Sequence, residues 1–175
     1  MQYMKTYDIE FVNPTMTTWT LLRQTWIALN RVTETKLAKA GLTPEKLAVL
    51  WAARDYPFEL TPAELARLLF RENQTVAGLL NRMVAEGLIR RTPKRKGRPY
   101  TQIKITYRGR QLCDSGVKIF AGLVQECSDD LSPGQRQQLH KSLRAMRDRM
   151  LDKIHVELEE RPKGYPPGEP IPLIW

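Results

Sequence analysis

The sequence has few of the residues that bind metals or form disulfides. Its 175 residues include two cysteines, Cys113 and Cys127, and two histidines, His140 and His155. The cysteines lie 14 positions apart in one expected helix. At about 1.5 Å per residue they are roughly 21 Å apart, which excludes a bond between them. There is no CxxC pair and the histidines lack i, i+4 spacing, so we expect neither a metal site nor another cofactor. Two roles stay open for the thiols: buried structural side chains, which we prefer, or redox sensors.

Long apolar runs and catalytic arrangements are absent too. No stretch reaches 18 uncharged apolar residues, so no membrane span is expected. Residues 1–13 lack the basic region and long apolar stretch of a secretory signal, and we expect a cytoplasmic protein. No Ser/His/Asp arrangement, phosphate-binding glycine loop or catalytic pair of carboxylates is found, so the chain is not expected to be an enzyme. With 42% hydrophobic and 27% charged residues it can still bury a core.

One segment has no acidic residues at all. Residues 90–110 hold nine of the 28 basic residues and none of the 19 acidic ones, so the rest of the chain is balanced and the net charge of +9 comes from this segment. A concentrated basic patch indicates a polyanionic partner such as nucleic acid. An acidic membrane surface is the competing partner. Surface-binding segments are amphipathic helices, however, and Pro93, Gly97 and Pro99 prevent a helix here.

Apolar stripes at helical spacing divide most of the chain into helices. They predict helices over 14–40, 43–54, 61–70, 73–86 and 107–128, and a last one from 133 onward. Thr43 and Thr61 are favourable N-cap residues, and each precedes a proline, which is favoured at the first helical position. Thr61 and Glu64 also have the spacing of a capping box. In the 73–86 helix the expected inner face is Val76, Leu80, Met83 and Val84.

Residues 88–92 and 100–106 have the character of two strands joined by the basic stretch, which makes that stretch the tip of a β-hairpin. The expected fold class is mainly α with a small β-hairpin wing, that is, a winged helix-turn-helix plus a helical dimerisation region. We expect an N-terminal segment and dimerisation helix over 1–42 and a winged helix over 43–106. Dimerisation helices follow over 107–160, and a Pro-rich extended tail over 161–175.

This order of elements favours double-stranded DNA as the partner, because the second helix of such a motif enters the major groove. Asparagine and glutamine can contact adenine, and arginine guanine, through paired hydrogen bonds. Gly78 either permits close approach to DNA or is a tolerated glycine; both interpretations stay open. The expected DNA-binding residues are Thr61, Asn73, Gln74, Thr75, Gly78, Arg82, Lys94, Arg95, Lys96 and Arg98. Arg98, in Gly-Arg-Pro, suits the minor groove, while a merely solvated cationic loop is the simpler alternative.

These motifs resemble the MarR family of bacterial transcription regulators. The resemblance covers residues 15–158 and is carried by short segments in the expected order: Leu42-Thr43-Pro44, Leu60 to Ala66, Thr75-Val76 to Leu80, Glu86 to Arg91, Ile103 to Thr106 with Gly109, and Leu131-Ser132-Pro133. It implies a homodimer with interleaved first and last helices, a palindromic operator, a repressor role and a small aromatic or phenolic ligand. One departure concerns the wing, where the family commonly has an Asp before its basic pair. This chain has no acid from Lys94 to Pro99, and Arg98 is the nearest match to the family's wing arginine.

The last helix needs a partner for its apolar stripe, because only the first and fifth helices remain to cover it. The expected dimerisation residues are Leu139, Leu143, Met146, Met150 and Ile154. The expected ligand-binding residues are Trp19, Arg23, Trp26 and Trp51, although tryptophans at helical spacing are more often core. The rival function is a DNA-binding protein without a small-molecule ligand, either architectural or controlled by a protein partner. The tail, ending Ile-Pro-Leu-Ile-Trp, packs on its own dimer or docks in a partner's groove.

Overall fold

The computed structural model of the chain describes residues 11–93 and 101–153. The helices are α1 (Pro14–Ala38), α2 (Pro44–Asp55), α3 (Pro62–Leu68), α4 (Asn73–Ala85), α5 (Tyr107–Ser128) and α6 (Pro133–Lys153), and the strands are β1 (Ile89–Pro93) and β2 (Thr101–Ile105). The expected fold class is confirmed, and each helix and strand predicted from the sequence is present with bounds shifted by a few residues. The expected DNA contacts Lys94, Arg95, Lys96 and Arg98, the dimerisation residue Ile154 and the tail 161–175 lie outside the described residues.

Local capping fixes where the helices begin. Thr43, Thr61 and Thr106 each precede a helix, and each accepts a hydrogen bond from the backbone N–H three residues later. The sequence predicted a capping box at Thr61, but the pair of reciprocal hydrogen bonds that defines such a box is found at the start of α6. There Ser132 accepts from the N–H of Gln135, and the Gln135 side chain accepts from the Ser132 N–H. These bonds satisfy backbone donors that the helix itself leaves unpaired.

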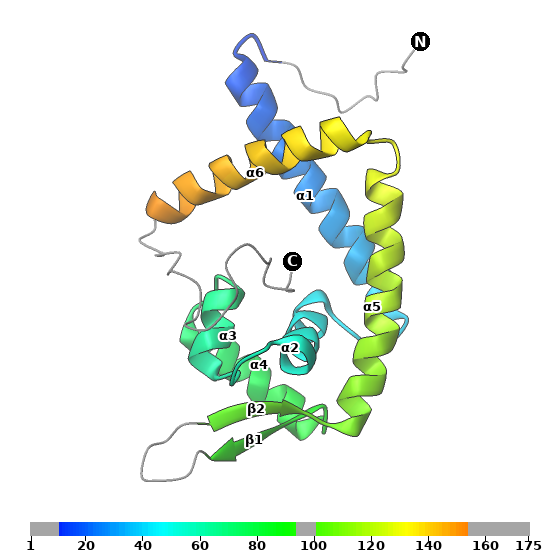
Figure 1. The fold of residues 1–175 in the computed structure, drawn as a ribbon, viewed down its shortest axis with the longest axis vertical. Helices are drawn as coiled ribbons and strands as arrows, with labels where there is room; N and C mark the ends of the chain where they lie inside the picture. Colours follow the sequence, from blue (N-terminus) through cyan, green and yellow to red (C-terminus); the bar gives the residue numbers. More distant parts are fainter. Residues whose placement is uncertain (1–10, 94–100, 154–175) are drawn as a thin grey trace.

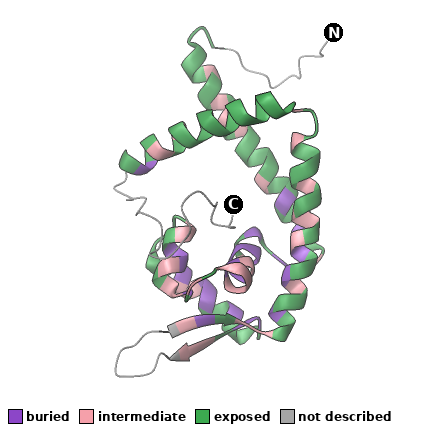
Figure 2. Cartoon of the chain, in the orientation of Figure 1, coloured by how far each residue is buried: buried purple, intermediate pink, exposed green. Residues whose placement is uncertain are grey.

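The hydrophobic core lies in the lower half of the molecule, among α2, α3, α4, the hairpin and the middle of α5 (Figures 1 and 2). Leu47, Leu50, Leu65, Leu80 and Met83 are all fully buried there. An ion pair between Lys46 and Glu86, 2.7 Å apart, joins the start of α2 to the end of α4 outside this core. The winged-helix region is therefore held as one packed unit.

The hairpin is joined to its surroundings on two sides. The strands are antiparallel, with Ile89 opposite Ile105 and Arg91 opposite Ile103. The N–H of Ile103 donates to the carbonyl of Leu60, which extends the sheet toward the segment before α3. The hydroxyl of Thr106 donates to the carbonyls of Gly87 and Leu88, at 2.7 and 3.0 Å. The root of the wing is thereby fixed to the beginning of α5.

The long helices extend away from this unit. Figure 1 shows α5 rising from the hairpin to α6, with α1 crossing near α6. Most residues of α1 and α6 are exposed in the single chain (Figure 2). Among the described residues, none of the helices combines the length and apolar character needed to cross a bilayer. The exposed surfaces of α1 and α6 are thus the part of the fold that the single chain leaves uncovered.

Candidate nucleic-acid interface

Helix α4 has one buried face and one exposed polar face. Val76, Leu79, Leu80 and Met83 are buried against the core. The expected inner stripe is wrong at Val84, which is 40% exposed, because packing covers the opposite flank of the stripe, where Leu79 lies. The expected base-reading residues Asn73, Gln74 and Thr75 lie in the first turn, and all are exposed, as is Arg82 further along. The structure thus leaves these four side chains at the surface of a helix fixed by its other face.

The beginning of α4 has no side-chain cap. Glu72 is the N-cap residue, but its side chain makes no capping hydrogen bond. Helix N-termini with free N–H groups favour phosphate oxygens, through both the donors and the helix dipole. Thr61 is different: its hydroxyl already caps α3 by accepting from the N–H of Glu64 at 3.1 Å. Thr61 can contact DNA only alongside that role.

Gly78 faces open space. A Cβ atom built there meets no atom within 4 Å, so no packing within the described chain requires glycine. A glycine in a helix interior costs about 1 kcal/mol relative to alanine. The two interpretations from the sequence, close approach to DNA and simple tolerance, therefore both remain, and packing is excluded as a third.

The root of the wing carries cations on both of its faces. Arg91 points toward α4, and its guanidinium donates to the carbonyl of Ala77 at the long distance of 3.4 Å. Arg90 is directly opposite Lys104 on the outer face, and both are exposed. Like charges directly opposite in a hairpin are destabilising. The positive charge of residues 90–110 therefore begins in the ordered strands and is not confined to the tip.

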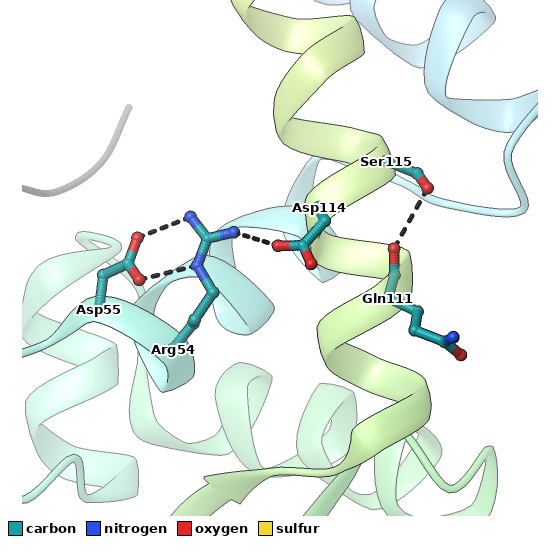
Figure 3. Close-up of polar contacts among 5 residues, drawn as sticks. All are labelled: Arg54, Asp55, Gln111, Asp114 and Ser115. Atoms are coloured by element: carbon teal, nitrogen blue, oxygen red, sulfur yellow. Dashed lines mark hydrogen bonds and ion pairs between the residues drawn. The ribbon is translucent and has the colours of Figure 1, made fainter.

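A network that the sequence did not reveal connects the winged helix to α5 (Figure 3). Arg54, at the end of α2, donates through Nε and Nη2 to the two carboxylate oxygens of Asp55, and through Nη1 to Asp114 on α5. The hydrogen bond to Asp55 is the main cause that holds the pKa of Arg54 above its usual range. Partners 60 positions apart give no local signal in the sequence, so only the fold could identify them.

A second polar contact lies in the loop between α2 and α3. The hydroxyl of Tyr56 donates to the Glu64 carboxylate, which also pairs with Arg67. Burial, followed by this hydrogen bond, raises the pKa of Tyr56 above its usual range. Tyr56 also packs edge-on against Phe58, with ring centroids 5.7 Å apart. These contacts order the loop that receives the N–H of Ile103 from the wing.

The two cysteines have different environments. Cys113 is fully buried, and this burial raises the pKa of its thiol from 9.0 to about 11. Cys127 is exposed, so the expectation that both thiols are buried is wrong for Cys127 in the single chain. Cys113 faces the core from the middle of α5, whereas Cys127 lies near the end of α5, beyond the winged-helix core. Among the described residues, no cluster of three or more possible metal ligands occurs.

The four expected ligand-binding residues are divided among different places. Trp19 lines a groove between α1 and α6, and Trp26 lines a cavity between α1 and the helices α2 and α4. Trp51 is half-buried and packs edge-on against Phe120, with ring centroids 6.1 Å apart, as a core residue does. Arg23 is exposed on α1. The single chain does not bring these four side chains together.

The expected dimerisation residues form an uncovered stripe on α6. Leu139, Leu143 and Met150 are 43%, 39% and 54% exposed, and Met146 is partly covered. Helix α1 also presents large apolar side chains to solvent, namely Met16, Trp19, Leu21, Trp26, Ile27, Leu29 and Val32. The groove between α1 and α6 has a volume of about 650 Å³.

Comparison with known proteins identifies a matching family model and solved structures of similar architecture. Residues 40–98 match the model of the MarR family. The chain is similar to the organohalide-sensing transcriptional regulator RdhR-CbdbA1625 in its 2,4-dichlorophenol-bound form, with 21% identity, a TM-score of 0.76, and coverage of 94% of this chain and 98% of that one. It is also similar to MepR of S. aureus in complex with DNA, with 24% identity, a TM-score of 0.69, and coverage of 74% and 94%.

A third similar structure is a mutant of MarR from E. coli in complex with operator DNA, with 21% identity, a TM-score of 0.68, and coverage of 79% of this chain and 99% of that one. A comparison with curated protein sequences gave no match. Together these similarities confirm the resemblance drawn from the sequence and the winged-helix fold.

Proposed function

We propose that this chain, a MarR-family protein by its winged-helix segment and its fold, is a sequence-specific DNA-binding transcription regulator that acts in the cytoplasm as a homodimeric repressor on a palindromic operator. The observation that carries the proposal is the combination of α4 and the wing. Asn73, Gln74, Thr75 and Arg82 are exposed on a helix whose opposite face is buried. Side chains of these types read base edges in the major groove.

The wing supplies the electrostatic part of binding. Arg90 and Lys104 are exposed at its root, and the basic tip residues lie between the two strands in the sequence. Contacts from lysine and arginine to phosphate fix the register of a protein on DNA without reading its sequence. The wing is bonded to α5 through Thr106, so its position is tied to the helices that we propose form the dimer.

Dimerisation is supported by what a single chain leaves exposed. The single chain leaves large apolar side chains exposed on two helices, namely Leu139, Leu143 and Met150 on α6 and Trp19 on α1. Monomeric soluble proteins rarely expose large contiguous apolar patches. Pairing two chains through α1 and α6 covers these faces and places two α4 helices on successive turns of DNA, about 34–36 Å apart.

Response to a small aromatic ligand is part of the proposal. The structure of RdhR-CbdbA1625 holds 2,4-dichlorophenol, and this chain has the same fold over nearly its whole length. A ligand changes DNA binding only if it binds the DNA-competent and incompetent states with different affinities. The ligand therefore has to contact elements that move relative to one another.

Selection of bound duplexes from random DNA tests the proposed function. We expect an enriched palindrome, and a salt dependence in which affinity falls by about 10³–10⁵ between 50 and 200 mM salt for six to ten phosphate contacts. The double variant Asn73→Ala/Gln74→Ala serves as the control: it should lose the sequence preference and retain the salt dependence. Tight binding without any enriched sequence would instead support an architectural DNA-binding protein, and a flat salt dependence would contradict DNA binding.

A further inference from the structure

A hollow of about 360 Å³ lies between the end of α2, the loop that follows it, the outer face of the hairpin and the start of α5. Figure 1 shows α2 above the hairpin, with the first turns of α5 beside both. We infer that this hollow is a docking site for an acidic segment of a partner protein. Such a site is additional to the proposed function, because no residue of the base-reading helix α4 lines the hollow.

Three cations reach the hollow from three different elements. Arg90 comes from β1, Lys104 from β2 and Arg110 from the first turn of α5. All three are exposed, and within the part of the chain that the structure describes none of them forms an ion pair. Arg90 is directly opposite Lys104, and like charges in such positions destabilise a hairpin. An anion bound among the three cations removes this repulsion.

The acidic residues nearby do not neutralise these cations. Asp114 lies one turn after Arg110 on α5, and Asp55 is the last residue of α2. Both carboxylates already accept hydrogen bonds from Arg54, as Figure 3 shows. Among the described residues, no acidic side chain lines the hollow. Its charge therefore has to be complemented from outside the chain.

The rest of the wall favours a peptide over a small ion. Tyr56 and Phe58 line the hollow from the loop, and Ala53 lines it from α2. All three are half-buried, and the two rings lie edge-on to each other. Tyrosine, phenylalanine and arginine are enriched at protein interfaces, and tyrosine and arginine often dominate the affinity. A free ion would use the cations alone, whereas acidic side chains around an aromatic one also cover this wall.

The hollow opens on the side of the hairpin opposite α4. Arg91 points toward α4, where its guanidinium donates to the carbonyl of Ala77. Successive side chains of a strand point to opposite faces, so Arg90 and the paired Lys104 point away from α4. Both cations still add to the positive field of the wing, which acts on DNA at a distance. A partner protein has access to this face while α4 lies in the major groove.

The backbone around the hollow is ordered before any partner binds. The N–H of Ile103 donates to the carbonyl of Leu60 at 2.9 Å, which joins the loop after α2 to β2. The hydroxyl of Thr106 donates to the carbonyl of Leu88 at 3.0 Å, which joins the root of the hairpin to α5. A surface that is already ordered loses less conformational entropy on binding. The three cations thus project from a preorganised frame.

The binding test uses the full-length protein without DNA and a synthetic peptide in which aspartate and glutamate flank one phenylalanine. Calorimetric titration at about 0.15 M ionic strength limits attraction by distant charges, since those more than about 8 Å apart are largely screened. We expect a dissociation constant at or below about 0.1 mM, and affinity about tenfold or more lower when asparagine and glutamine replace the acids. Replacing the peptide's phenylalanine with glycine should also lower the affinity about tenfold, because a buried ring is lost.

Arg110→Gln is the decisive variant, and Arg108→Gln is its matched control. Each removes one charge from an exposed arginine in the first turn of α5, but Arg108 does not line the hollow. We expect Arg110→Gln to lower the affinity for the acidic peptide about tenfold and Arg108→Gln to change it less than about twofold. Arg110→Glu should reject the acidic peptide and bind a version in which lysine replaces one of its acids. That exchange of charges shows that the variant is folded and that the contact is local.

Four outcomes would overturn the inferred site. Absence of peptide binding is the first, and equal losses for Arg108→Gln and Arg110→Gln, which would mean that the peptide responds only to overall charge, are the second. Displacement of the peptide by an equal concentration of inorganic pyrophosphate would assign the hollow to a small anion. Displacement by a random-sequence duplex would assign it to the DNA interface. None of these measurements needs an operator, so their failure and the failure of the proposed function are distinguishable.

Discussion

Arg54 Nη1 lies 2.7 Å from Asp114 Oδ1, and this pair joins the last turn of α2 to the middle of α5 (Figure 3). The same guanidinium holds Asp55 at 2.7 Å, so one side chain links both carboxylates. The Arg54 side chain is 18% exposed, whereas Asp55 is 33% and Asp114 is 54% exposed. The contact connects the winged-helix unit to the long helix α5, which leads toward the proposed dimer.

Replacing Arg54 with alanine should lower the free energy of unfolding by about 1–2 kcal/mol, because two carboxylates lose their hydrogen-bond donor in a partly buried place. Asp114→Asn should cost less than about 1 kcal/mol, since the exposed carboxylate is well solvated. Urea unfolding measures both values. Asp148→Asn, in the exposed pair with Arg147, is the matched control and should change stability by no more than a few tenths of a kcal/mol. Equal effects at Arg54 and Asp148 would show that the bridge does not join the two helices.

Gly78→Ala should raise the free energy of unfolding by about 1 kcal/mol, because alanine favours a helix interior and the new methyl group meets open space. The same variant decides between the two interpretations of this glycine. Reduced affinity for the selected operator indicates that DNA approaches the backbone closely at Gly78, whereas unchanged affinity indicates a tolerated glycine. Both are obtained from one protein sample by thermal unfolding and by titration of labelled duplex.

Cys113 should be far less reactive than Cys127 toward an alkylating reagent at pH 8. Burial both hides the Cys113 thiol and raises its pKa to about 11, so little thiolate is present. Since the folded protein favours the protonated thiol, the associated stability is complete below the unfolded pKa near 9 and is lost as the pH rises toward 11. Mass spectrometry of each cysteine peptide over time measures the two rates, and equal rates would contradict the assigned burial.

Neutralising the wing should weaken DNA binding without changing the sequence that is read. Each Lys→Gln or Arg→Gln change that removes a phosphate contact should reduce the slope of log affinity against log salt by about 0.9. Arg90→Gln and Lys104→Gln test the described root, and Lys94→Gln tests the tip. A change in base preference on Arg98→Gln alone would assign that arginine to the minor groove and not to phosphate.

The sequence predicted the elements well because their signals are local. Thr43 and Thr61 were recognisable as caps from their own neighbours, and each accepts the expected backbone hydrogen bond. Periodicity also identified Val76, Leu80 and Met83 as the inner face of α4. It could not decide between Leu79 and Val84, because both flank that face and only the packed fold covers one of them.

Features that depend on distant parts of the chain were not predictable. Arg54 and Asp114 pair only because α2 packs against α5 in the fold, and no local sequence pattern indicates this contact. Phe70 showed no signal either, since its positive φ follows from the way α3 ends. The three tryptophans were expected to line one ligand site, but Trp51 packs on the core while Trp19 and Trp26 line a groove and a cavity that are separate from each other.

The contact at Gly109 has a mechanical consequence. A Cβ atom there would lie 2.0 Å from the Leu88 carbonyl, so α5 starts directly against the turn from which the wing departs. With Thr106 bonded to the same turn, the wing and α5 form one stiff lever of 22 helical residues, about 33 Å long. Tilting that lever by about 5° at its far end moves the wing root by about 3 Å, given that length. In the dimer that we propose, a small rearrangement between two copies of α5 would therefore be enough to move one wing out of register with the DNA.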